Sequence, residues 1–160
     1  MKYILISIFI ILLSSCDGGL EPLGVEQKSI LDVSLKFVDS DKNWPPQDSI
    51  LALRVAAFKK MPDSSIINDI IAGNAYFDFT SLPLFVDSAG TRFEITDAPV
   101  DLVYIAAVQQ YDSLITSQRV VGIYTITGDK TKPSQLKIEK GKNYSINIDI
   151  DFNNLPPMPF

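Results

Sequence analysis

The chain has 160 residues, a length that suits one domain with a sizeable hydrophobic core. Hydrophobic residues make up 46% and charged residues 21%, a composition typical of folded proteins and unlike that of disordered ones. The net charge of −5 argues against nucleic acid as a partner, because binding to phosphates depends on clustered lysine and arginine. The chain contains no histidine, which removes the commonest general base and the commonest transition-metal ligand.

Residues 1–15 have the anatomy of a signal peptide. Lys2 supplies a small positive region, an unbroken apolar run follows over residues 3–13, and Ser14 and Ser15 are small residues of the kind found before a cleavage site. A transmembrane helix needs about 20 apolar residues to cross the bilayer, so this run is too short to span it. We therefore expect residues 1–15 to be cut away.

The single cysteine of the chain follows this segment directly. Leu13-Ser14-Ser15-Cys16 resembles the lipobox of bacterial lipoproteins, and that resemblance implies a diacylglycerol on the sulfur of Cys16 and palmitate-type acyl chains at the new amino terminus. More than one acyl chain gives durable attachment to a bilayer. The expected location is the bacterial cell envelope, on an extracytoplasmic membrane surface, with the outer membrane as the expected membrane.

Two other interpretations of Cys16 stay open: an ordinary secretory signal with a chance cysteine, and a buried structural cysteine. Asp17 resembles the inner-membrane retention signal of enteric bacteria, so the choice of membrane also stays open. Because no second cysteine is present, no disulfide can form within the chain, and the stability of the domain must come from its core.

The expected organisation is a lipoprotein signal peptide over residues 1–15, a tether over 16–29, a β-sandwich domain over 30–153 and a carboxyl-terminal tail over 154–160. The tether is rich in glycine and acidic residues and has no periodicity. A flexible segment of this length has a root-mean-square span of about 20 Å. The domain should therefore stay close to the membrane.

Strand patterns dominate the domain. Residues 30–38 alternate between apolar and polar side chains, as a half-buried strand does, and residues 49–59 are apolar on both sides, as in a central strand. Lys140-Gly141-Lys142 is typical of a tight hairpin turn. Further strands are expected over residues 76–80, 84–86, 91–96, 101–110, 119–127, 135–139 and 143–152. Seven or eight short strands predict an all-β fold, an antiparallel two-sheet β-sandwich.

One short helix is expected over residues 64–72. Ser64 or Ser65 can cap its start, Gly73 can end it, and Ile66, Ile67, Ile70 and Ile71 share a stripe. A helix of two turns is marginal alone, so its isoleucines should pack over an open end or edge of the sheet.

The order of these features resembles the transthyretin-like, or carboxypeptidase regulatory-like, β-sandwich domains of secreted bacterial proteins. The segments that carry the resemblance are residues 90–95, residues 97–104, residues 136–141 and residues 144–152. The glycine that this family has after its proline turn is absent, since Val100 and Asp101 stand there. The resemblance implies the prealbumin-like fold over most of the domain.

Three aromatic residues are candidate ligand-binding residues. Trp44 is the only tryptophan and lies in a proline-containing polar loop, where its ring could stack on a sugar or grip a peptide. The alternative, which we favour, is that Trp44 folds back over the end of the sandwich core. Tyr111 and Tyr124 are secondary candidates on the same terms.

No metal site or cofactor is expected. Asp149 and Asp151 place oxygen atoms on one strand face, but Ca²⁺ takes oxygens from several directions, so a solvated outer face is the better interpretation. The aspartates at positions 39, 41 and 48 match no ligand spacing. The chain also has no histidine base and no Gly-x-Ser-x-Gly nucleophile motif, so no catalytic residue is assigned and an enzyme is not expected.

Two hypotheses follow for function. The first is a non-catalytic, membrane-anchored envelope lipoprotein whose sandwich is a structural or protein-interaction domain. The second is a small carbohydrate- or peptide-binding module that uses the Trp44 loop. The expected partners are the membrane, through the lipid on Cys16, and an envelope protein or glycan.

Overall fold

The computed structural model describes residues 27–63 and 65–160, and this part of the chain is mostly β-structure. The signal peptide, Cys16 and nearly all of the tether lie outside the described residues. Within the described part no helix is long and apolar enough to cross a membrane. The elements are β1 (Ser29–Phe37), the 3-10 helix η1 (Gln47–Ser49), β2 (Ala52–Phe58), α2 (Ile66–Ile71), β3 (Ala75–Phe77), β4 (Ser88–Ile95), β5 (Val100–Leu102), β6 (Tyr104–Gln110), β7 (Gln118–Ile123), β8 (Leu136–Ile138) and β9 (Asn143–Ile150).

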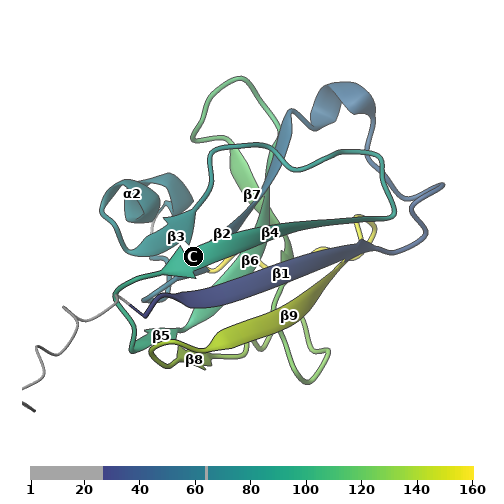
Figure 1. The fold of residues 1–160 in the computed structure, drawn as a ribbon. Helices are drawn as coiled ribbons and strands as arrows, with labels where there is room; N and C mark the ends of the chain where they lie inside the picture. Colours follow the sequence, from purple (N-terminus) through teal and green to yellow (C-terminus); the bar gives the residue numbers. More distant parts are fainter. Residues whose placement is uncertain (1–26, 64) are drawn as a thin grey trace, which may run out of the picture.

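The strands form two layers, as a sandwich does (Figure 1). One sheet has the order β4-β1-β9, the other has the order β3-β2-β6-β7, and β5 and β8 form a small separate pair. The expectation of a purely antiparallel arrangement is wrong in one place, because β1 and β9 pair in parallel. The hairpin expected between the last two strands is also absent from the described ladders, since β8 pairs with β5. The turn between them is nevertheless tight, with Gly141 at a φ of +72°.

The main core fills the space between the two layers. Alternate residues of β1 and β9 are buried, as their period of two predicted, and they face the inner residues of β2, β6 and β7. At Gly122 of β7, an added Cβ would lie 2.8 Å from the Ile148 side chain. A glycine is therefore needed there to let β7 and β9 approach closely.

A second apolar cluster covers the outer face of the β3-β2-β6-β7 sheet. Ser65 precedes helix α2 and caps it, because its hydroxyl accepts a hydrogen bond from the backbone N–H of Asn68. Gly73, two residues after the helix, has a φ of +75° and turns the chain away. Ile66, Ile67 and Ile70 are buried on the sheet, whereas Ile71 is 76% exposed. The helix therefore covers a sheet face rather than an end or edge. This second layer explains why β2 and β6 are apolar on both sides.

Two expected strand segments differ from the structure. Residues 84–86 form no strand and instead pack Leu84 and Val86 against the core from a loop. The segment expected over residues 101–110 is divided into β5 and β6 at Val103. Pairing with different partners explains the division, because β5 pairs with β8 while β6 pairs with β2 and β7.

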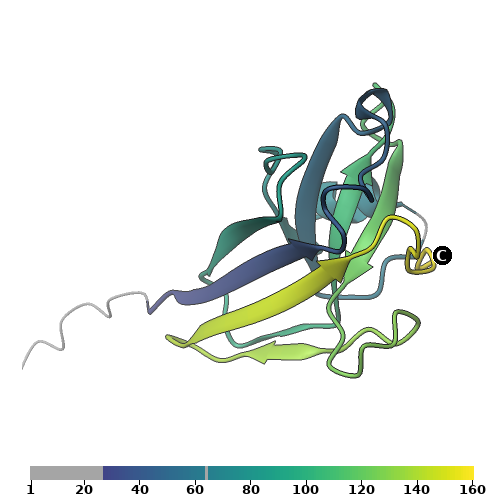
Figure 2. The same ribbon diagram turned by 90° about the vertical axis from the view of Figure 1, so that its right-hand side faces the viewer.

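The sandwich has two distinct ends (Figures 1 and 2). The chain enters at the start of β1, where the Ser29 hydroxyl donates to the Glu139 carbonyl at 2.8 Å and accepts from the Gly141 N–H at 2.9 Å. We call this the entry end. The opposite end, the loop end, is formed by the segments 38–51, 78–87, 111–117 and 151–155, which follow or precede strands that stop there.

Candidate functional site

Trp44 lies at the loop end within a group of aromatic rings. Its ring centroid is 4.4 Å from that of Phe37, 5.0 Å from that of Phe152 and 5.1 Å from that of Phe85. We call these four residues the Trp44 cluster. The side chain of Trp44 is half-buried against the main core, and its Nε1 is buried with no hydrogen-bond partner in the described residues. The ring therefore closes the end of the sandwich.

A hydrogen-bonded loop holds this cluster in place. The Asn43 side chain is buried, and its amide donates to the Val38 carbonyl at 3.1 Å and to the Asp151 carboxylate at 2.7 Å. The bond from Asn43 lowers the pKa of Asp151 below its ordinary value, because it stabilises the charged form. The loop around Trp44 is thus tied to the chain that follows β9.

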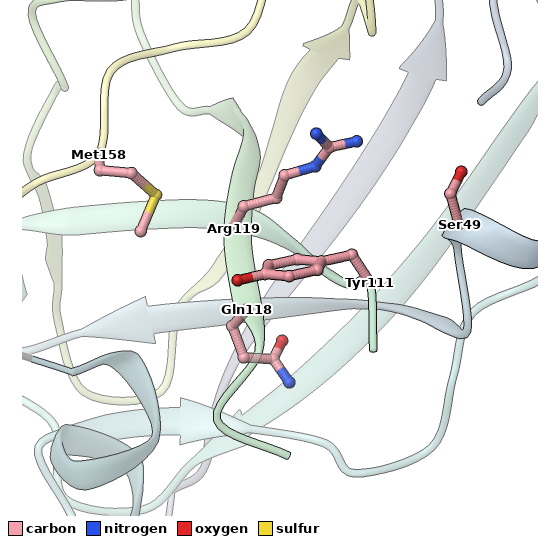
Figure 3. Close-up of a pocket in the computed structure, with 5 residues that line it drawn as sticks. All are labelled: Ser49, Tyr111, Gln118, Arg119 and Met158. Carbon is pink, nitrogen blue, oxygen red and sulfur yellow. The ribbon is translucent and has the colours of Figure 1, made fainter. Parts of the chain in front are cut away.

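Tyr111 lies at the same end but in a different setting. It follows β6 and lines a groove of about 520 Å³ together with Ser49, Gln118, Arg119 and Met158. We call these five residues the Tyr111 groove. Figure 3 shows Arg119 and Gln118 leaving β7 in opposite directions, with the ring of Tyr111 between them in the view. The volume lies within the range of pockets that hold small ligands.

Hydrogen bonds fix the position of Arg119 in this groove. Its Nε donates to the Gln109 side-chain oxygen at 2.8 Å, and the Gln109 amide donates to the Ser49 carbonyl at 2.7 Å. Gln109 is fully buried. Its two hydrogen bonds connect Ser49 of η1 to Arg119 of β7. Within the described residues the two Nη groups of Arg119 donate to no protein acceptor.

Tyr124 lies away from Tyr111. It follows β7 at the other end of that strand, is half-buried and packs against the main core. Its backbone N–H donates a hydrogen bond to the Ile105 carbonyl, and its carbonyl accepts one from the Ser134 N–H. The structure therefore does not bring Trp44, Tyr111 and Tyr124 together in one site.

The entry end carries a cluster of titratable groups. The Asp97 carboxylate accepts hydrogen bonds from Lys59 and from the hydroxyl of Tyr76, and Lys59 Nζ lies 4.6 Å from the centroid of the Tyr76 ring. The pKa of Tyr76 is raised, mainly by burial and to a smaller extent by the hydrogen bond to Asp97. The pKa of Asp97 is lowered, mainly by the hydrogen bond from Lys59 and to a smaller extent by that from Tyr76. Because each group has a partner, the cluster ties β2 and β3 to the chain after β4.

The described residues hold no group of three or more His, Cys, Asp or Glu side chains placed to bind a metal ion. Asp151 instead accepts from Asn43 and from the backbone of Asn153. Cys16 lies outside the described residues. Searches with the chain find no matching protein-family model, no matching curated protein and no matching solved structure.

Of the five residues of the Tyr111 groove, only Tyr111 was predicted from the sequence. Ser49, Gln118, Arg119 and Met158 come from η1, β7 and the tail, so only the fold brings them together. The one local signal was the polar pair Gln118-Arg119 at the start of an otherwise apolar strand.

Proposed function

We propose that the chain is a bacterial envelope lipoprotein, anchored by acyl chains on Cys16, whose sandwich is a non-catalytic protein-interaction domain. The proposal takes the location from the lipobox-like sequence Leu13-Ser14-Ser15-Cys16 and from the apolar segment before it. Several acyl chains at the amino terminus would hold the domain durably at an extracytoplasmic membrane surface.

The observation that carries the proposal is the arrangement of the two ends. Twelve residues separate Cys16 from Ser29, where the chain enters the sandwich next to Glu139 and Gly141. The Trp44 cluster and the Tyr111 groove lie at the opposite end, in the loops that connect and follow the strands. A lipid on Cys16 would thus hold the entry end toward the membrane and leave the loop end accessible to other envelope components.

A finer assignment of the fold belongs to the same proposal. The two-layer, short-strand architecture supports placing the domain with the transthyretin-like sandwiches. The segments that resemble that family lie on β4, on the chain from β5 into β6, and on β8 and β9. The parallel pairing of β1 with β9 is a specific feature whose presence or absence in transthyretin-like domains can be compared.

The second candidate, a small binding module, is favoured by the Tyr111 groove. The groove is open to solvent and presents Arg119, whose two Nη groups have no acceptor among residues 27–63 and 65–160. In the Trp44 loop, by contrast, the ring lies against three phenylalanines. A binding module would therefore use Tyr111 rather than Trp44 as its contact aromatic.

Mass spectrometry of the amino terminus tests the anchor. The full chain is expressed in a bacterial host and purified from membranes, and we expect a polypeptide that begins at Cys16 and carries acyl chains. Cys16→Ser should remain as the unprocessed precursor and incorporate no labelled fatty acid. An intact precursor with unmodified Cys16 in the soluble fraction would overturn the proposal.

Protease digestion tests the side of the membrane. In cells whose outer membrane has been made permeable, we expect added protease to degrade the domain while a cytoplasmic marker protein stays intact. Protection of the domain under these conditions would contradict an extracytoplasmic location.

A further inference from the structure

The Tyr111 groove contains a buried acceptor that lacks a donor. Gln118 is 8% exposed, and its Oε1 is buried with no hydrogen-bond partner among the described residues. The orientation of the amide is fixed, because Nε2 donates to the Ile115 carbonyl at 2.9 Å. Figure 3 shows the oxygen turned toward the ring of Tyr111. An unpartnered buried acceptor is costly, so a ligand that supplies an N–H would gain from it.

The groove also contains a preorganised cation. Arg119 is held at Nε by Gln109, which is itself held by the Ser49 carbonyl, while the Nη groups stay without protein acceptors in the described residues. A guanidinium presents its donors in a planar fork that matches the two oxygens of a carboxylate. Because the supporting glutamine is fully buried, little side-chain freedom remains to be lost when a ligand binds.

We propose that the Tyr111 groove binds the carboxyl-terminal end of a peptide. The terminal carboxylate lies on the Nη groups of Arg119, a backbone N–H of the peptide donates to Gln118 Oε1, and an apolar side chain packs on Tyr111 and Met158. Tyr111 and Met158 line the groove beside Gln118 and are 47% and 38% exposed, so both present apolar surface to a ligand. The inference rests on the proposed function, since it names the partner chemistry of an interaction domain.

The chemistry of the groove favours a peptide over other anions. A phosphate or a sugar acid would use Arg119, but it would bring neither the apolar group that suits Tyr111 and Met158 nor an amide donor beside the carboxylate. Asp48 and Asp112 are exposed and adjoin Ser49 and Tyr111 in sequence, so a polyanion would be repelled. A single carboxylate on an uncharged peptide meets these conditions.

Two peptides that differ at one group provide the test. N-acetyl-Ala-Ala-Leu with a free carboxylate and the same peptide with a carboxamide end are titrated into the ¹⁵N-labelled full chain in detergent micelles. We expect the free acid to shift the amide signals of residues 111–120 and to bind at least tenfold more tightly than the carboxamide. Muramic acid and inorganic phosphate, tested alongside, should bind more weakly than the free acid.

Arginine variants locate the carboxylate. Arg119→Gln should abolish the tenfold preference for the free acid, and Arg119→Lys, which keeps the charge without the planar fork, should recover only part of it. Arg92→Gln is the matched control, because Arg92 pairs with Asp32 on the other sheet and should leave binding unchanged. If circular dichroism shows that Arg119→Gln does not fold, the comparison of the two peptides on Arg119→Lys and on the parent protein tests the role of Arg119.

Equal binding of acid and carboxamide, unchanged binding in both Arg119 variants, or tighter binding of the sugar acid or phosphate would overturn the proposal. The same samples are examined at Cys16 by mass spectrometry, which separates the two proposals. A protein that is acylated but binds neither peptide would overturn the proposal for the groove alone. A protein that carries no acyl groups but binds the free acid more tightly would overturn the proposal for the anchor alone.

Discussion

Trp44 and Tyr111 lie in loops at the same end of the molecule, yet their surroundings differ in kind. The Trp44 ring contacts three phenylalanine rings and belongs to the core, whereas Tyr111 is 47% exposed beside a guanidinium and a glutamine. The difference teaches that a loop aromatic is informative about binding only when polar groups converge beside it. Trp44 should therefore contribute to the stability of the domain and Tyr111 to the recognition of a partner.

Trp44→Ala should give the largest loss of stability. Removing the ring takes away its contacts with Phe37, Phe85 and Phe152 and opens the end of the main core. Because the side chain is half-buried, we expect the free energy of unfolding to fall by about 2–4 kcal/mol. Urea denaturation followed by circular dichroism measures it. Peptide binding in the groove should persist below the unfolding transition, and unchanged stability would contradict the structural role.

Gln109→Leu should cost less but affect both regions. It leaves the Ser49 carbonyl without its donor and frees Arg119 Nε from its acceptor, so we expect a loss of about 1–3 kcal/mol in the free energy of unfolding. Peptide binding should also weaken, since the guanidinium is no longer held. Gln135→Leu is the matched control, because Gln135 is exposed before β8 and makes no side-chain hydrogen bond among the described residues. Tight binding in Gln109→Leu would show that Arg119 needs no support.

The bond between Asn43 and Asp151 should make the stability of the Trp44 loop depend on pH. Because the folded pKa of Asp151 is lowered, its contribution is fully present above the unfolded pKa of about 3.9 and is lost as pH falls through the folded pKa. Asp151→Asn should therefore be slightly less stable than the parent protein at pH 7, and the difference should vanish in acid. Urea midpoints between pH 7 and pH 2 measure this.

Asp48→Asn is the control for that series, since Asp48 is an exposed residue of the same loop. A difference between Asp151→Asn and the parent protein that stays constant across the pH range would contradict the assignment of the effect to the Asp151 charge.

These contrasts show which parts of the molecule the sequence could predict. The alternation of β1 and β9 and the cap at Ser65 are local signals, and both are confirmed by the structure. The parallel pairing of β1 with β9 was not predictable, because partner choice between strands more than 100 residues apart depends on the whole fold. Arg119 was missed for the same reason: its role depends on Gln109 and Ser49, which reach it only through the paired strands.

Tyr111→Ala should have the smallest effect on stability and a clear effect on binding. The hydroxyl has no hydrogen bond among the described residues and the ring is largely exposed, so the free energy of unfolding should change by no more than about 0.5 kcal/mol. Affinity for N-acetyl-Ala-Ala-Leu should fall several-fold, because the apolar wall of the groove is lost. Tyr111→Phe, which keeps the ring, should bind as the parent protein does. If Tyr111→Ala destabilised the chain as strongly as Trp44→Ala, both aromatics would belong to the core and the contrast between the two loops would fail.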